Sequence, residues 1–290
     1  MRYYKSHGII FLIPILIIIV LFYGMIVWDV FAAFTHWQGL LPTWQFNGFK
    51  NFSRLFQMNR FWINLRNNIL WLAIFIVPTV VVGFSLAYLI TNLKRGETIL
   101  WQIFLFPMAL SFIITGVLWA WMYDPSSGVI NSILRLIGVN TSRLGWIALP
   151  KSAIYCMIFS AFWQYLGFAM VIYLGAIKSL PLEMVEAARV DGASHFTISF
   201  RIIFPNVGHA TLISTTMLAI TTVKAFDLVW VMTRGGPGVS TEILPYLMYR
   251  LTFDSRDIGM GAATSIVMLI FSAIIVIPYS LWALKKWVRI

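Results

Sequence analysis

Charge and cysteine are both scarce in this chain of 290 residues. Only 11% of the residues are Asp, Glu, Lys or Arg, whereas a soluble domain of this size carries about a quarter. The one cysteine, Cys156, excludes a disulfide framework and a cysteine-rich metal site. The four histidines have no spacing suggestive of a metal site, so we expect none. These absences argue against an ordinary water-soluble enzyme.

The few charges are nevertheless unbalanced, with 21 Lys and Arg against 10 Asp and Glu and a formal net charge of +11. A surface that binds nucleic acid needs Lys and Arg clustered on one solvated face. The sequence has no run of five or more basic residues, so we expect no nucleic-acid partner.

Apolar residues, in contrast, make up 60% of the chain, and the mean hydropathy is +0.85. A bilayer core about 30 Å thick requires roughly 20 apolar residues in a helix. Six stretches are this long, at about residues 9–34, 69–90, 99–122, 152–174, 208–232 and 259–284. We therefore predict an all-α, polytopic membrane protein with six transmembrane helices. Although Val30-Phe31-Ala32 could pass as a cleavage site, the first stretch exceeds a signal-peptide core, so we expect it to be retained.

Basic residues do not decide the membrane orientation by number. With a cytoplasmic N-terminus, the inner segments hold ten Lys and Arg in 55 residues and the outer segments ten in 89. The higher inner density favours cytoplasmic N- and C-termini. Residues 1–8 are then a cytoplasmic tail, and residues 9–290 form the transmembrane domain. In the first outer segment, the aromatic and basic residues of 52–68 predict a helix lying on the membrane surface or on neighbouring spans.

Only one inner segment is long, at residues 175–207. Pro181 suits the first turn of a helix, and Gly192 suits the position just after a helix ends. Between them, Glu186 and Arg189 lie three residues apart and can pair. The sequence therefore predicts a short, charged, amphipathic helix between two spans.

The same loop resembles the EAA loop of the membrane subunits of ATP-binding-cassette (ABC) importers. That motif reads EAA, three residues, G, nine residues, I, one residue, LP. The matching residues here are Glu186-Ala187-Ala188, Gly192, Ile202 and Pro205, with Phe204 in place of the usual Leu.

The resemblance implies the type I ABC-importer permease fold and a cytosolic loop. In that family the helix docks into a cleft of the ATP-hydrolysing subunit and couples nucleotide-driven closure to the membrane pathway. Glu186, Ala187, Ala188 and Gly192 would then be the contact and hinge positions.

Further residues resemble the carbohydrate-uptake branch of that family. Residues 224–237, KAFDLVWVMTRGGP, are similar to the maltose-type first permease subunit, of which the turn Gly235-Gly236-Pro237 is characteristic. The resemblance implies a sugar cargo, a monosaccharide such as glucose or a short oligosaccharide. It also implies a second homologous permease, two ATPase subunits that bind ATP and Mg, and an extracytoplasmic binding protein that docks on the outer loops, including this turn.

The chain itself carries no ATPase motif. A P-loop needs glycines whose backbone N–H groups cradle phosphate, and the nearest match, GWIALPKS at residues 145–152, has Pro150 at the second glycine position. We predict that the chain is not an enzyme and holds no cofactor of its own.

Polar residues inside the spans are candidates for the sugar pathway, because sugars present both hydroxyls and apolar ring faces. The resemblance aligns Tyr165 and Gly167 with a sugar-contacting Trp and Gly, and Thr222 with a sugar-contacting Asn. The residue pattern adds Gln164, Thr221, and the Thr115 and Trp119 that share one helical face with Ser111. Small polar residues also join transmembrane helices, so each of these positions has a structural alternative.

Lys224 and Asp227 are ionisable residues near the middle of the fifth predicted span, where charge is costly. Three residues apart on a helix they can form an internal ion pair; alternatively they act as a gate or polar contact in the pathway.

Two other functions remain open at this stage. One is an ABC permease for glycerol phosphate or another polyol, for which Lys224 is the in-span cation. The other is an ion-coupled secondary transporter, which would need inverted repeats and midplane ion ligands; we find no such repeat.

Overall fold

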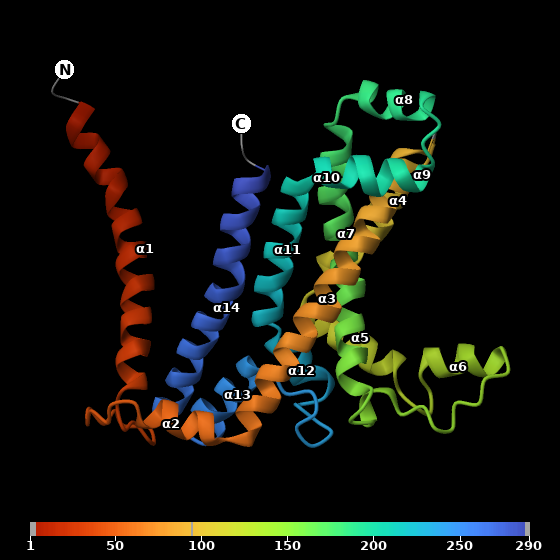
Figure 1. The fold of residues 1–290 in the computed structure, drawn as a ribbon. Coiled ribbons are helices and arrows are strands. Elements are labelled where there is room, and N and C mark those ends of the chain that lie inside the picture. Colours follow the sequence, from red (N-terminus) through yellow and green to blue (C-terminus); the bar gives the residue numbers. More distant parts are fainter. Residues whose placement is uncertain (1–3, 94, 288–290) are drawn as a thin grey trace. The chain divides into compact units, whose positions relative to one another are not determined.

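The computed structural model describes residues 4–93 and 95–287, and the regular elements in this part of the chain are all helical (Figure 1). Of the predicted N-terminal tail, residues 1–3 therefore lie outside the described residues. The elements of the first half are α1 (Tyr4–Ala33), α2 (Lys50–Gln57), α3 (Asn59–Thr91), α4 (Glu97–Leu105), η1 (Phe106–Ala109), α5 (Phe112–Met122), α6 (Val129–Leu136) and η2 (Trp146–Ala148). Those of the second half are α7 (Ala153–Lys178), α8 (Leu182–Val190), α9 (His195–Thr197), η3 (Ile198–Ile203), α10 (Phe204–Asn206), α11 (Gly208–Val223), α12 (Phe226–Met232), α13 (Leu244–Tyr249), η4 (Arg250–Asp254) and α14 (Ile258–Trp287).

The chain divides into two units. Unit 1 consists of Met1–Trp62 with Leu247–Ile270, and unit 2 of Ile63–Tyr246 with Phe271–Ile290. Unit 2 holds the larger buried core, around Trp71, Phe75 and Tyr173.

Four helices, α1, α3, α7 and α14, are long and apolar enough to cross a membrane. Two more crossings are counted if each of two sharply bent helix pairs forms one span. The six predicted apolar stretches are therefore all helical, but only four of them are single unbroken spans.

The third predicted span, residues 99–122, is broken, and its prediction as one helix is wrong. The pair formed by α4 with η1 and by α5 bends by 99°. Leu110 is extended at the break (ψ 144°), and the Ser111 hydroxyl accepts the N–H of Ile114 at 3.3 Å as the cap of α5. Ser111 is thus the N-cap of α5, the helix that contains Thr115 and Trp119.

The fifth predicted span and the predicted surface helix are also interrupted. In residues 208–232, α11 ends at Val223, and α12 begins at Phe226. In residues 52–68, α2 ends before Met58, which is extended (ψ 117°), and the rest of the segment belongs to the long helix α3.

Candidate coupling helix, solute pathway and docking loop

The amphipathic helix predicted in the 175–207 loop is α8, which follows the end of α7 (Figure 1). Pro181 precedes its first residue, and Gly192 follows its end in the left-handed region, at φ +76°. The N–H of Ala193 donates to the carbonyl of Ala188 at 3.0 Å and closes the turn. The predicted helix between Pro181 and Gly192 is confirmed. Its two ends could be predicted because Pro and Gly act on the backbone locally.

One side of α8 packs against the rest of unit 2. Ala188 is buried, and the guanidinium of Arg189 donates to Asn92 Oδ1, just beyond α3, at 3.1 Å. Arg189 makes this bond rather than the pair with Glu186 that their spacing predicted.

The opposite side of α8 is exposed. Glu186 and Ala187 are both exposed, and the apolar side chains of Leu182 and Val190 are 65% and 86% exposed. A short helix that presents apolar side chains around a carboxylate, away from its own core, has the character of a protein-docking element.

The segment after Gly192 anchors the loop to α3. It runs through α9, the π-helix η3 and α10. The Phe204 ring centroid lies 4.9 Å from that of Phe84 in an edge-on pair, and Tyr88 Oη lies 3.0 Å from His195 Nδ1. Phe204, the one departure from the family motif, therefore packs in an aromatic cluster with a residue of α3.

The three fourth-span candidates all contact the broken third span. Gln164 is buried, and its Nε2 donates to the Leu110 carbonyl at 2.6 Å. The Tyr165 ring stacks on Phe112 with a centroid distance of 5.5 Å. A Cβ on Gly167 would lie only 2.0 Å from the Phe104 carbonyl oxygen. Gln164 and Gly167 thus pack α7 against the break between α4 and α5. This packing is a structural role that does not require contact with a sugar.

The third-span candidates lie on α5, which packs against α12. Gly116, beside Thr115, would bring a Cβ to 3.3 Å from Val231. Thr115 is fully buried, and its hydroxyl has no hydrogen-bond partner within residues 4–93 and 95–287. Trp119 packs edge-on against Trp163 and Phe159.

The fifth-span candidates lie at the end of α11. The Thr222 hydroxyl donates to the Leu218 carbonyl, and the Thr221 hydroxyl to the Met217 carbonyl, each at 2.9 Å. Both hydroxyls are therefore engaged within their own helix. Thr222 is buried, whereas Thr221 is partly exposed.

The structure records no ion pair between Lys224 and Asp227 in its described part, so that interpretation is corrected. The physical reason is the helix break: Lys224 is the exposed cap residue that follows α11, and Asp227 lies in the first turn of α12. The two residues therefore do not share one continuous helix, and the i, i+3 geometry is lost.

The predicted docking turn Gly235-Gly236-Pro237 follows α12 and has a specific backbone shape. Gly235 has φ +82°, and a Cβ there would lie 2.6 Å from Glu242 Cγ. The Thr241 hydroxyl donates to the Gly236 carbonyl at 2.8 Å. Only glycine fits at Gly235, both for its backbone angle and for its space.

Sequence reasoning missed the residues that hold this turn in place. Asn67 Nδ2 donates to the carbonyls of Ser240 and Glu242 at 3.0 and 2.8 Å. Asn64 Nδ2 donates to the Glu242 carboxylate at 3.2 Å, and Asn68 Oδ1 accepts the N–H of Leu244 at 2.8 Å. We call these three asparagines of α3 the asparagine clamp. Three asparagines within five residues, directly before the apolar stretch 69–90, are the sequence signal that could have identified them.

The turn and α8 lie at opposite ends of α7. The Thr233 hydroxyl, at the end of α12, contacts Met157 Sδ near the start of α7 at 3.6 Å, whereas α8 follows the last residue of α7 (Figure 1). From Met157 to Lys178 a straight helix rises by about 32 Å, which is the thickness of a bilayer core.

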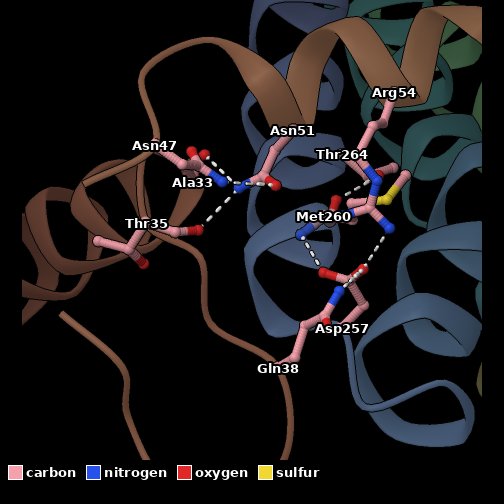
Figure 2. Close-up of polar contacts among 9 residues, drawn as sticks. All are labelled: Ala33, Thr35, Gln38, Asn47, Asn51, Arg54, Asp257, Met260 and Thr264. Atoms are coloured by element: carbon pink, nitrogen blue, oxygen red, sulfur yellow. Dashed lines mark hydrogen bonds and ion pairs between the residues drawn. The ribbon is translucent and has the colours of Figure 1, made fainter. Parts of the chain in front are cut away.

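Unit 1 contains a second polar network that the sequence did not reveal (Figure 2). Asn51 is buried, and its Nδ2 donates to the carbonyls of Ala33 and Thr35 at 2.8 and 2.9 Å. The Asp257 carboxylate accepts Arg54 Nη2 at 2.9 Å, Gln38 Nε2 at 3.1 Å and the N–H of Met260 at 3.2 Å. Asp257 therefore caps α14 while joining it to α2.

No group of three or more His, Cys, Asp or Glu residues within 4–93 and 95–287 is placed to hold a metal ion. Cys156 is buried and free.

Comparison with known proteins gives the family and the fold of the chain. Residues 57–284 match the family described as binding-protein-dependent transport system inner membrane component. A probable ABC transporter permease protein of Pyrococcus horikoshii is 42% identical over 96% of this chain and 95% of its own length. The xylose/arabinose import permease protein XacH of Haloferax volcanii is 30% identical over 94% of this chain and 86% of its own. The same fold occurs in a bacterial ABC transporter involved in the import of the acidic polysaccharide alginate, with a TM-score of 0.81, 21% identity and coverage of 98% and 99% of the two chains.

Proposed function

Because the chain belongs to the family of binding-protein-dependent transport system inner membrane components, we propose that it forms, with a second permease, the translocation pathway of an ABC importer for a sugar. The cargo is a monosaccharide such as glucose or a short oligosaccharide, delivered by an extracytoplasmic binding protein. The import of xylose and arabinose named for the Haloferax volcanii relative supports a carbohydrate cargo. Family membership favours this function over the ion-coupled secondary transporter.

The observation that carries this proposal is the exposed face of α8. Leu182 and Val190 are largely exposed on either side of Glu186 and Ala187, as a helix that enters a cleft on another subunit requires. We assign the ATP-hydrolysing subunit to this face, with α8 and both chain termini in the cytoplasm. ATP and Mg are then held by that partner, and this chain is not an enzyme.

The long helix α7 gives a mechanical route between the two faces of the membrane. Its first turns contact the end of α12, beside the Gly235-Gly236-Pro237 turn, and its last turn leads into α8. Docking of the binding protein at that turn would bias the arrangement of α12 and α7, and closure of the ATPases would move α8. The fourth-span residues Gln164 and Tyr165 lie on α7, so the proposed pathway and α8 would be linked through this helix.

The test is an assembled transporter reconstituted in lipid vesicles with its binding protein. We expect Glu186→Ala to lower binding-protein-stimulated ATP hydrolysis and uptake about tenfold, within the usual range of coupling energies. Glu183→Ala, which removes an exposed carboxylate from the same helix, is the matched control and should retain both activities. Equal activity of the two variants in an intact complex would contradict the coupling role of α8.

A phosphorylated cargo, such as glycerol phosphate, is the second candidate because Lys224 is exposed and forms no ion pair among the described residues. Calorimetry of the cognate binding protein against glucose, maltose, glycerol phosphate and glycerol separates the candidates. If glycerol phosphate alone binds, the sugar assignment fails while the importer assignment stands.

A further inference from the structure

An apolar cavity of about 670 Å³ lies where α5 ends and α7 begins. Segments from both helices, α6 and the η2 region contribute to it. Its lining residues are Trp119, Met122, Tyr123, Ile130, Trp146, Lys151, Ser152, Tyr155, Cys156 and Phe159. All of them belong to unit 2.

Aromatic rings form a continuous wall on this cavity. The ring centroids of Trp146 and Tyr123 lie 5.7 Å apart, those of Tyr123 and Trp119 5.3 Å, and those of Trp119 and Phe159 5.2 Å. Trp119, predicted on the solute pathway, is therefore part of a hydrocarbon-like surface.

The polar atoms of this wall are already used inside the protein. Trp146 Nε1 donates to Asn131 Oδ1 at 2.8 Å, and the Tyr123 hydroxyl donates to the Cys156 carbonyl at 3.2 Å. The Ser152 hydroxyl donates to the Trp146 carbonyl. A sugar would leave its hydroxyls unsatisfied here, which is costly, so the cavity does not suit the proposed cargo.

Trp146, which forms part of the aromatic wall, has a strained backbone. Its φ is +42°, in the left-handed region that bulky residues avoid. Such strain persists where the surroundings fix the residue, and it concentrates at ligand-binding positions. Asn131, which is fully buried and also donates to the Pro125 carbonyl at 2.9 Å, fixes the indole.

The mouth of the cavity combines apolar and cationic groups. Tyr155 and Phe159 are about half exposed and extend the apolar lining outward along α7. Lys151 is exposed just before α7, and it is the one charged residue of the lining. Lysine and tryptophan at the ends of spans lie at the level of the lipid headgroups.

We propose that this cavity binds an acyl chain of an anionic phospholipid, with the lipid phosphate beside the Lys151 ammonium. The hydrocarbon chain matches the dry aromatic wall, and the negative headgroup complements the single cation at its mouth. The cavity shares Trp119 with the predicted sugar pathway, but the lipid proposal rests on the cavity wall and Lys151 and does not depend on the proposed function.

The test is native mass spectrometry of the purified full-length chain with dioleoyl phosphatidylglycerol and dioleoyl phosphatidylcholine. We expect the wild-type chain to retain phosphatidylglycerol preferentially. Lys151→Gln should lower that preference about fivefold, the effect of one basic residue near an anionic membrane surface. Arg143→Gln removes the same charge from an exposed position outside the cavity and should leave the preference unchanged.

A second variant tests the cavity itself. Ile130→Trp fills the space from its α6 wall and should reduce retention of both lipids while the chain still purifies as a folded protein. The proposal is overturned if Lys151→Gln and Arg143→Gln behave alike, or if Ile130→Trp retains both lipids at the wild-type level. It is also overturned if a photo-crosslinker at Tyr155 in the assembled transporter reacts with the second permease instead of lipid.

Discussion

The carboxamide of Asn67 on α3 donates to the backbone carbonyl of Glu242 at 2.8 Å across a sequence separation of 175 residues. With the second bond of the same carboxamide to Ser240, it supplies the segment after the Gly235-Gly236-Pro237 turn with the donors that no helix or strand provides there. The segment that follows the turn is therefore held by α3.

Asn67→Ala removes the donors to the buried Glu242 carbonyl and to the partly buried Ser240 carbonyl, so we expect a loss of about 1–3 kcal/mol of stability for each carbonyl left unsatisfied. The expected signs are a lower thermal-unfolding midpoint of the purified chain and faster amide exchange in residues 240–244. Asn140→Ala is the control, because Asn140 is exposed and bonds only locally to Ser142, and it should stay within about 0.5 kcal/mol of wild type. Similar losses in both variants would show that the asparagine clamp has no special role.

Two glycines of α7 should respond oppositely to the same substitution. Gly167→Ala would place a Cβ 2.0 Å from the Phe104 carbonyl oxygen, whereas nothing lies within 4 Å of a Cβ on Gly175. We expect Gly167→Ala to cost at least about 1–3 kcal/mol through overpacking, and Gly175→Ala to be neutral or to stabilise by up to about 1 kcal/mol. Thermal unfolding of the purified variants measures both, and a stable Gly167→Ala protein would mean that α4 can move away from α7 at little cost.

The docking turn offers a comparable pair. Gly235 and Gly238 both have positive φ, +82° and +64°, so alanine costs about 1–2 kcal/mol at either position. Only at Gly235 does the new Cβ also collide, at 2.8 Å from Tyr246 Cε1. We expect Gly235→Ala to raise the binding-protein concentration needed for half-maximal ATPase stimulation far more than Gly238→Ala. If the two variants need the same concentration, the collision does not affect the docking surface.

Asp257 and Asp254 lie three residues apart but differ in their contacts. Asp257 caps α14 and binds Arg54 and Gln38 (Figure 2), whereas Asp254 makes an exposed ion pair with Arg250 at 3.4 Å. Asp257→Ala should cost about 2 kcal/mol or more, from the lost cap and its charge-assisted bonds. Asp254→Ala should cost about 0.5 kcal/mol or less. Limited proteolysis between α1 and α2 provides the readout, and equal cleavage of the two variants would contradict the assignment.

Local features of the fold could be predicted from the sequence. The apolar stretches predicted helices because the bilayer core contains no water, so the backbone N–H and C=O groups must form hydrogen bonds with one another. Pro181 and Gly192 predicted the ends of α8 because their conformational preferences act within one turn.

The interruptions could not be predicted with the same rules. Pro107 and Ser111 mark the break between α4 and α5, yet the whole of 99–122 has the length and composition of one span. The break also depends on Gln164, whose side chain reaches the Leu110 carbonyl from another helix. Likewise, the predicted ion pair between Lys224 and Asp227 required a continuous helix, but α11 ends at Val223, before both residues.

Only the part of the candidate site that depends on local sequence could be predicted. The identity and limits of α8 follow from a local motif. The asparagine clamp and the Asp257 network instead join segments far apart in the sequence, and no periodicity in α3 or α14 identifies their partners. The predicted roles of Tyr165, Thr222 and the other pathway residues stay predictions, since the contacts in this chain describe how they pack and not what they bind.

The bond between Gln164 and Leu110 has a consequence for how the chain is made. Leu110 is synthesised 54 residues before its partner, so a chain made only as far as α6 lacks the donor that this carbonyl has in the folded protein. The turn between α4 and α5 therefore gains its bond to Gln164 only after α7 has been synthesised.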